Sequence, residues 1–202
     1  MKKIIKLGLV LGIFACVSCV LLAVVNNFTA PEIERIENEK EQNALKSVLP
    51  GAAGYPKAGA EELKAVVDSC KAEIGSVKIN KIFKAVDSTG NVIGYAANIT
   101  GPTFETTTIL LGTDPEMKVT GVTILKTTDT PGKQKMADYK TSKVAAKKGM
   151  SFTEQFRDCT AEDFANGTNY EIISGATLSS GGVANMIKAG IKVLEVYKAS
   201  NK

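Results

Sequence analysis

The sequence predicts an α+β protein, with one N-terminal transmembrane helix followed by a single exported domain. Three observations support this fold class: an uncharged apolar run over residues 7–25, segments rich in β-branched residues between 78 and 126, and helical apolar stripes on both sides of that region. The 202 residues allow one domain of ordinary size, and a 44% hydrophobic content can supply its core. We expect a mostly antiparallel sheet packed against helices.

The apolar run over residues 7–25 is long enough to cross a membrane. At about 1.5 Å of rise per residue it covers a hydrocarbon core of roughly 30 Å. Lysines precede the run and the first acidic residue is Glu32, so the positive-inside rule places the N-terminus in the cytoplasm. We expect a single-pass protein of the cell (inner, cytoplasmic) membrane, with a cytoplasmic segment 1–6, a transmembrane helix 7–27 and an extracytoplasmic domain 28–202.

Two other readings of the N-terminus fit less well. A cleaved signal peptide has a shorter apolar core and a small-x-small cleavage site, whereas this run is long and no A-x-A pattern follows it. Lipid attachment at Cys16 or Cys19 is disfavoured because the residues before each cysteine do not follow the aliphatic, small, small approach of a lipidated cysteine. A retained anchor is therefore the preferred interpretation.

Two helices are expected before the sheet. Residues 26–31 contain Asn, Thr and Pro and predict a polar interruption after the membrane run. Residues 32–49 then combine an apolar stripe with a dense charged face, and Pro50 and Gly51 end this helix. A second helix is predicted over 60–74, followed by Gly75.

The middle of the chain changes to strand patterns bounded by Gly, Asp, Asn and Pro. The predicted strands are 78–86, 92–99, 106–111 and 118–126. Residues 88–91 and 113–116 read as hairpin turns between them. Sequential strands joined by such short turns give an antiparallel sheet.

The C-terminal third is less regular until its last element. Residues 136–148 form a basic segment compatible with a helix, and residues 170–173 predict a short strand. The last helix is expected after residues 179–182, because its apolar stripe follows the 3–4 spacing of a buried helix face: Val183, Ile187, Ile191, Leu194 and Tyr197.

Composition excludes several kinds of function. The chain has no His, which removes the commonest general base, the usual partner in a Ser or Cys triad and the commonest transition-metal ligand. The net charge of +4 falls to about +1 beyond the N-terminal lysines, so we expect no nucleic-acid binding. No CxxC occurs and no metal site is expected; Cys70 and Cys159 are far apart in sequence, which leaves their pairing open.

The stretch most capable of binding a ligand is residues 171–182, EIISGATLSSGG. A turn of small residues precedes a helix, and hydroxyls cluster where the unpaired N–H groups of a helix N-terminus favour a phosphate. Ser and Thr are equally common as plain helix caps, so spacing alone leaves both readings open.

The run Ser-Gly-Ala-Thr-x-Ser-Ser before an amphipathic helix resembles the flavinylation motif of the FMN-binding domain family. This family includes the RnfG component of the Rnf electron-transport complex and the corresponding flavin-carrying component of the sodium-pumping NADH:quinone reductase. The resemblance also covers the basic N-terminus with one span, the strand 90–95, the turn 112–114 and a Thr-Pro-Gly loop. It implies covalent FMN on Thr177 through a phosphoester bond, with further cofactor contacts from two segments: Ser174, Gly175, Ala176, Leu178, Ser179 and Ser180, and Thr130, Pro131 and Gly132.

Some positions depart from the family pattern. The family's Glu-Thr-Pro-Gly-Leu-Gly loop is replaced by Asp-Thr-Pro-Gly-Lys-Gln at residues 129–134, which changes the expected flavin contact at Lys133 and Gln134. The acidic residue three places before the motif Ser is commonly Asp and is Glu171 here. The aromatic-Gly strand after Gly101 is also altered, to residues 102–104, Pro-Thr-Phe.

The resemblance implies an electron relay. We expect a membrane-anchored flavoprotein that passes electrons within an Rnf-type ferredoxin:NAD oxidoreductase, with other membrane subunits as partners and a separate flavin transferase that modifies Thr177. No catalytic acid–base residue of its own is expected, since the chemistry belongs to the flavin. Two alternatives stay open: the same flavin domain in a sodium-pumping quinone reductase or an extracellular reductase, and a non-redox anchored binding module in which residues 174–182 are only a helix cap.

Overall fold

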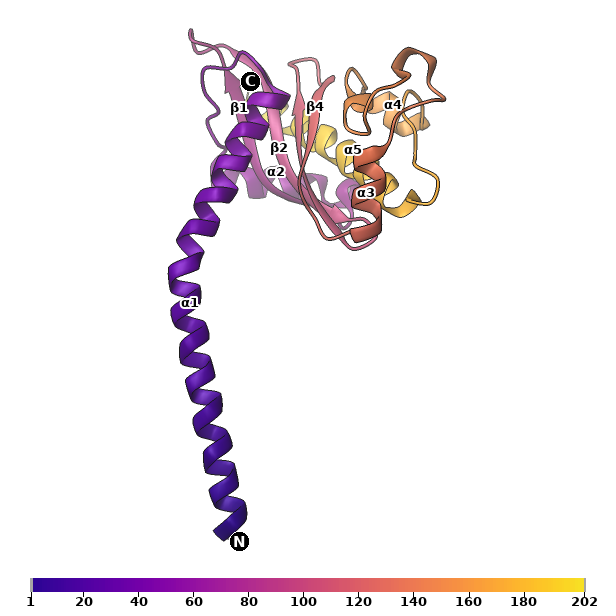
Figure 1. The fold of residues 1–202 in the computed structure, drawn as a ribbon. Coiled ribbons are helices and arrows are strands. Elements are labelled where there is room, and N and C mark those ends of the chain that lie inside the picture. The colour runs from indigo at the N-terminus through magenta and orange to yellow at the C-terminus, as the bar shows by residue number, and fades with distance from the viewer. Residues whose placement is uncertain (1, 202) are drawn as a thin grey trace. The chain divides into compact units, whose positions relative to one another are not determined.

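The computed structural model describes residues 2–201, except for the side chains of residues 2–4 and of Pro131. The chain divides into two compact units, Met1–Lys40 and Glu41–Lys202. The elements are labelled in Figure 1 and have these bounds: α1 (Lys2–Val48), α2 (Ala60–Ile74), β1 (Lys78–Val86), β2 (Val92–Pro102), β3 (Thr106–Thr113), β4 (Val119–Thr127), α3 (Thr130–Asp138), α4 (Ala161–Asn166) and α5 (Thr177–Ser200), with 3₁₀ turns at Ala145–Lys147 and Glu154–Phe156.

The first unit is helical, and its apolar part is long enough to cross a membrane by length and composition. The predicted interruption at residues 26–31 is wrong, because α1 continues through Pro31. A proline removes one main-chain hydrogen bond, but strong helix formers follow it at once. Arg35 reinforces this turn by pairing with Glu32 at 2.6 Å and with Glu39, one turn on either side.

The four strands form an antiparallel sheet in the order β1-β2-β3-β4. This confirms the predicted antiparallel sheet and both hairpin turns: the Asp87 carboxylate accepts the N–H groups of Thr89 and Asn91, and the Asp114 carboxylate accepts that of Lys118. The predicted strand bounds hold to within three residues, with β2 extending to Pro102 and β3 to Thr113.

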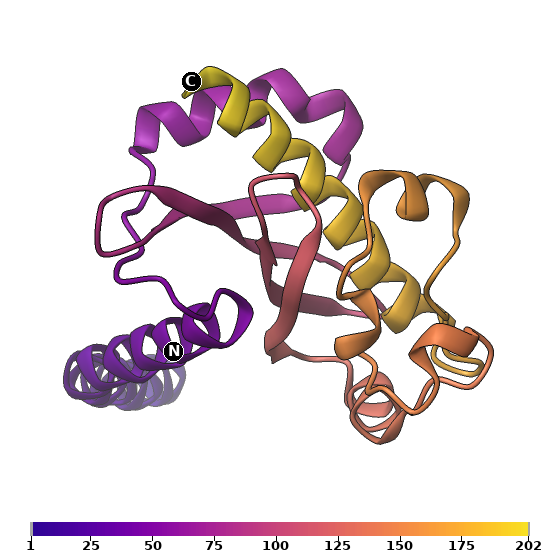
Figure 2. The same ribbon diagram turned by 90° about the horizontal axis from the view of Figure 1, so that it is seen from above.

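Each face of the sheet has its own apolar layer, because successive side chains of a strand point to opposite faces. Ile109 and Leu111 of β3 belong to the larger cluster, which the sheet forms with α2 and α5. Leu110 between them belongs to a smaller cluster with Leu45 and Val48. Figure 2 shows α2 and α5 together over one face and the end of α1 on the other. Helix α5 is therefore held firmly where it crosses β2 and β3.

The two helices that matter for the site begin earlier than predicted. Helix α3 begins at Thr130 rather than Met136, since Pro131 in the first turn has the backbone angle a helix start requires. Helix α5 begins at Thr177 and includes Gly181 and Gly182. A Cβ at Gly182 would lie 2.6 Å from the carbonyl oxygen of Pro102, so α5 packs closely against the end of β2 at this position.

Two further expectations about local structure are corrected. Residues 170–173 are not a strand, because the main chain of Glu171 pairs with the side-chain amide of Gln155 instead of a neighbouring strand. Residues 139–144 are not helical, because three of their N–H groups turn toward the Glu171 carboxylate. The open question of the cysteines is answered: Cys70 and Cys159 are both buried and both free.

Candidate functional site

Thr177 is the first residue of α5, and its side chain is exposed. The first helical hydrogen bond runs from Ser180 N to Ala176 O at 2.9 Å, and no side chain caps the helix. Within the described part of the chain, the N–H groups of Thr177, Leu178 and Ser179 therefore have no hydrogen-bond partner. A hydroxyl free to react thus stands among main-chain donors that favour an anion.

The turn before Thr177 is shaped by Gly175 and Ser180. Gly175 adopts φ +75°, a conformation that favours glycine, and the main-chain N–H of Ala176 donates to Ile173 O at 3.0 Å. The Ser180 hydroxyl accepts from Ile173 N at 3.0 Å and donates to Ala176 O at 2.8 Å. Ser180 is fully buried, so its hydroxyl braces the turn, while Ser174 is exposed at the turn's outer side.

The N-terminal turn of α3 lies against that of α5. The structure brings the predicted Thr-Pro-Gly segment to the motif: Gly132 is buried, and a Cβ built there would lie 2.7 Å from Ser179 Cβ. Thr130 is exposed, and the side chain of Pro131 lies outside the described residues. Only a glycine allows the two helix ends to approach this closely.

Asp129, just before α3, fixes the turn between β2 and β3. Its fully buried carboxylate accepts from Thr103 Oγ1 at 2.9 Å, Phe104 N at 3.0 Å and Glu105 N at 2.7 Å. Burial acts to raise the pKa of this carboxyl, but hydrogen bonds from the Ser179 hydroxyl and these donors outweigh it and hold the pKa below its usual value. One ionised group thus connects the turn, α3 and α5.

These elements enclose a cavity of about 290 Å³ at Thr177. Two large apolar side chains stand beside it unusually exposed: Phe104 is 62% and Leu178 66% accessible. The cavity is lined by Phe104, Gly132 and five consecutive residues of the motif, Gly175, Ala176, Thr177, Leu178 and Ser179. Apart from the hydroxyls of Thr177 and Ser179, the side chains that line this cavity are apolar, and further polar contacts are available from main-chain N–H groups.

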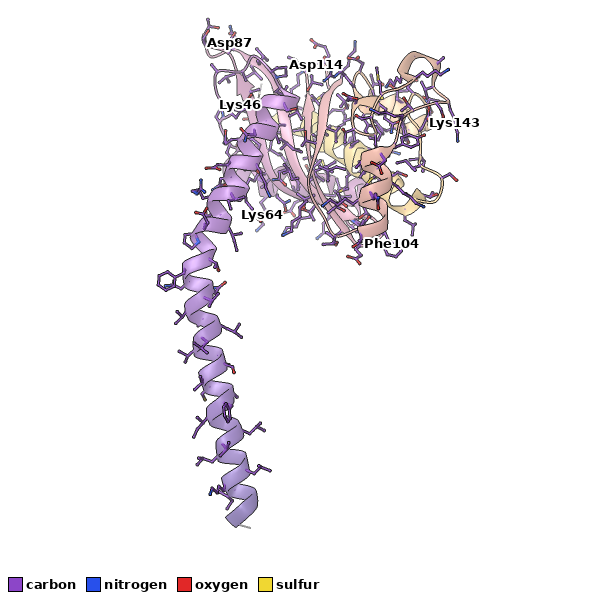
Figure 3. The ribbon with its side chains drawn as sticks, viewed as in Figure 1. Lys46, Lys64, Asp87, Phe104, Asp114 and Lys143 are labelled. Atoms are coloured by element: carbon purple, nitrogen blue, oxygen red, sulfur yellow. The ribbon has the colours of Figure 1, made fainter. Side chains whose placement is uncertain are left out.

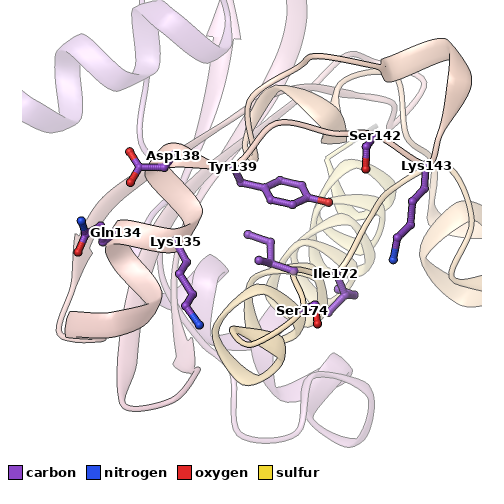
Figure 4. Close-up of a pocket in the computed structure, with 9 residues that line it drawn as sticks. Gln134, Lys135, Asp138, Tyr139, Ser142, Lys143, Ile172 and Ser174 are labelled. Carbon is purple, nitrogen blue, oxygen red and sulfur yellow. The ribbon is translucent and has the colours of Figure 1, made fainter.

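A second cavity of about 760 Å³ lies on the other side of the turn (Figure 4). Lys135 of α3 separates the two, since its Nζ donates to Gly175 O at 2.7 Å. Figure 4 shows Lys135 and Lys143 on opposite sides of this cavity, with Ser174 between them. The larger cavity therefore borders the turn that positions Thr177.

Glu171 organises the far wall of this second cavity. Its buried carboxylate accepts the N–H groups of Ser142, Lys143 and Val144 at 2.5–3.0 Å and the hydroxyl of Tyr139. Burial opposes its ionisation, but these hydrogen bonds dominate and lower its pKa to about 2. Glu171 thus has a structural role, which holds the loop after α3 close to the motif.

Sequence reasoning did not assign site roles to Asp129, Lys135 or Phe104. Asp129 and Phe104 were visible only as departures from a family pattern, and Lys135 as one lysine of a basic segment. Their roles depend on contacts with residues 24 to 40 positions away, which periodicity cannot detect.

The chain is similar to known proteins over most of its length. Residues 1–48 match the family described as the RnfG N-terminal region, and residues 105–192 match the FMN-binding domain. The chain is 29% identical over 208 residues to the G-type component of the Na(+)-translocating ferredoxin:NAD(+) oxidoreductase complex of Acetobacterium woodii, covering 96% of this chain and 93% of that protein. It is 27% identical over 197 residues to the G-type component of the ion-translocating oxidoreductase complex of Methanosarcina acetivorans, covering 94% of each.

Proposed function

We propose, from the premise that an RnfG N-terminal region here precedes an FMN-binding domain, that this chain is a membrane-anchored flavoprotein that relays electrons through FMN bound covalently to Thr177. Its setting is an Rnf-type, ion-translocating ferredoxin:NAD oxidoreductase, as the names of its two relatives suggest. The observation that carries the proposal is the exposed, uncapped Thr177 at the mouth of a cavity built from both predicted segments.

The surroundings of Thr177 suit a phosphate ester. The N–H groups of residues 177–179 are free to donate, and the positive end of the α5 dipole points to the same place. The N-terminal turn of α3 adds a second helix start at Gly132. Four hydrogen-bond donors around the buried Asp129 carboxylate, including the Ser179 hydroxyl, stabilise its negative charge in place.

The same surroundings suit an aromatic ring system. Phe104 and Leu178 present apolar surface beside the cavity, and within the described part of the chain most of that surface is accessible. FMN supplies the electron transfer, accepting and releasing electrons at its ring. The chain's own residues orient the ring, exclude water from one side of it and hold the phosphate, which requires none of the acid–base residues that the composition lacks.

The covalent link is tested on the full-length chain produced together with a flavin transferase. We expect flavin fluorescence that survives denaturation on a gel, and FMN mass on the peptide that contains Thr177. Thr177→Ala should abolish both, whereas Thr168→Ala, at an exposed threonine beyond α4, should abolish neither. An unmodified wild-type peptide would favour the anchored binding module with a plain helix cap.

The anchor and the partners are tested in native membranes. We expect the chain to resist extraction with carbonate, and a protease added from outside the cytoplasm to reach residues 41–202 but not the N-terminus. Co-purification with other Rnf subunits would support the Rnf setting over a quinone reductase or an extracellular reductase. Digestion of the domain only from the cytoplasmic side would contradict the proposed orientation.

A further inference from the structure

The charge of the chain is concentrated beside the proposed flavin site. Residues 133–148 contain six lysines and one acidic residue, Asp138, for a formal charge of +5, whereas the whole chain carries +4. The remaining 186 residues therefore carry a net charge of −1. This segment comprises most of α3 and the loop after it, which Glu171 holds against the motif.

Most of these lysines have no partner of their own. Within the described residues, Lys133, Lys140, Lys143 and Lys148 are exposed and form no ion pair. Lys147 is different, because its Nζ turns inward to Gln155 O at 2.6 Å and to Cys159 Sγ at 2.9 Å. The exposed lysines thus leave a net positive charge at this surface.

Two of the six lysines line the larger cavity. Lys135 and Lys143 line it from two sides, and Ser174, three residues before Thr177, lines it between them (Figure 4). Figure 3 shows the place of Lys143 on the domain. Its volume of about 760 Å³ admits several side chains of another protein. A carboxylate entering here would lie between two ammonium groups and next to the turn whose carbonyl Lys135 holds.

We propose that this lysine face, defined as residues 133–148 around the larger cavity, is the docking surface for an acidic protein whose own redox centre exchanges electrons with the flavin. The proposal rests on the proposed function, since the flavin on Thr177 gives the docking its purpose. An acidic protein fits better than an anionic lipid surface, because electrons must enter or leave next to Thr177 and a lipid headgroup layer supplies no redox centre. Charge pairing of this kind mainly accelerates association.

The first test is zero-length crosslinking in native membranes. A carbodiimide joins lysines only to carboxylates they touch, so we expect Lys143 and Lys148 to be linked to acidic residues of a protein that carries a redox cofactor. The exposed lysines Lys71 of α2 and Lys188 of α5, outside this face, serve as internal controls and should not be linked to it. Links from all four lysines alike would overturn the proposal.

The second test compares charge reversals in the membrane-bound protein. Lys143→Glu with Lys148→Glu should slow flavin reduction on the order of tenfold at low salt and remove most of its salt dependence. Lys71→Glu with Lys188→Glu should change neither. Equal rates in the two double variants would overturn the proposal. So would normal rates combined with lost binding to vesicles of anionic phospholipid, which would identify the face as a lipid contact.

Flavin fluorescence after denaturation distinguishes failure of the proposed function from failure of the docking surface. If the charge-reversal variant keeps covalent flavin but its flavin is reduced more slowly at low salt, the docking surface is supported. If the wild-type protein carries no flavin, the proposed function fails, and the crosslink to a redox protein alone then decides the docking surface. Absence of that crosslink would overturn it in either case.

Discussion

The hydroxyl of Tyr139 donates a 2.5 Å hydrogen bond to the carboxylate of Glu171, and the contact moves the two pKa values apart. The pKa of Tyr139 is raised to about 12 by the hydrogen bond to Glu171, by burial of the phenol and by the charge of Glu171. The pKa of Glu171 falls to about 2, because the bonds from Tyr139 and three main-chain N–H groups outweigh its burial. The pair fixes the end of α3 and the following loop beside residues 171–174.

Glu171 should therefore make the domain acid-sensitive. A carboxyl whose pKa falls from 4.5 to about 2 on folding stabilises the fold fully above pH 4.5, and this contribution is lost as the pH falls from about 4.5 to about 2. Glu171→Gln should flatten the stability profile in that range and cost about 1–3 kcal/mol at neutral pH, because a neutral amide accepts more weakly than a carboxylate and one of its two acceptor oxygens becomes an NH₂ donor. Thermal unfolding of the full chain at several pH values measures this.

The control for this experiment is Glu116→Gln, at an exposed position in the turn between β3 and β4. It should leave unchanged both the thermal unfolding midpoint at neutral pH and the fall of that midpoint between pH 4.5 and about pH 2. If the unfolding midpoint of Glu171→Gln falls with decreasing pH just as in the wild type, other carboxyls must cause the acid sensitivity and the role given to Glu171 is wrong.

The sheet and α2 could be predicted from the sequence because local patterns determine them. The β-branched segments and their Asp- and Gly-rich turns carry their own signal, and α2 begins and ends where its apolar stripe and Gly75 place it. Helices α1, α3 and α5 could not be bounded in this way. Pro31 and the pair Gly181 and Gly182 are local helix breakers, and the surrounding chain or tertiary packing overrides them.

The residues of the site also differ in whether the sequence could predict them. Thr177 could be predicted because its motif is contiguous and specific. The three supporting contacts could not, because Asp129 reaches Glu105, Lys135 reaches Gly175, and Glu171 reaches Lys143 across 24, 40 and 28 positions. Each of these side chains would look like an ordinary surface charge in the sequence alone.

Two adjacent glycines of α5 should respond oppositely to alanine. A Cβ at Gly181 meets nothing within 4 Å, so Gly181→Ala should stabilise the full chain by about 0.5–1 kcal/mol through helix propensity. A Cβ at Gly182 would lie 2.6 Å from Pro102 O and 2.9 Å from Thr103 Cα, so Gly182→Ala should destabilise it by about 1–3 kcal/mol. Denaturant midpoints compare the two, and equal shifts would contradict the packing of α5 on the β2–β3 turn.

The close approach of α3 to α5 predicts that Ser179→Gly should partly rescue the defect of Gly132→Ala. Gly132→Ala would place a Cβ 2.7 Å from Ser179 Cβ and should separate the two helix ends, lowering the fraction of chains that carry flavin after co-production with the transferase. Adding Ser179→Gly removes the opposing Cβ and should restore part of that fraction. Gel fluorescence per mole of protein gives the measurement. A double mutant no better than Gly132→Ala would show that Gly132 acts through something other than this contact.

Phe104 and Leu178 should affect the flavin without affecting the fold. Both side chains are mostly exposed, so Phe104→Ala and Leu178→Ala should change the free energy of unfolding by no more than about 0.5 kcal/mol. Each should nevertheless shift the absorbance maxima and midpoint potential of the attached flavin, because loss of an apolar neighbour admits water to the ring. Val92→Ala, at a 38% exposed apolar residue of β2 outside this cavity, is the matched control and should leave both unchanged. Identical spectra and potentials in all three variants would mean that the ring lies elsewhere, even with FMN confirmed on Thr177.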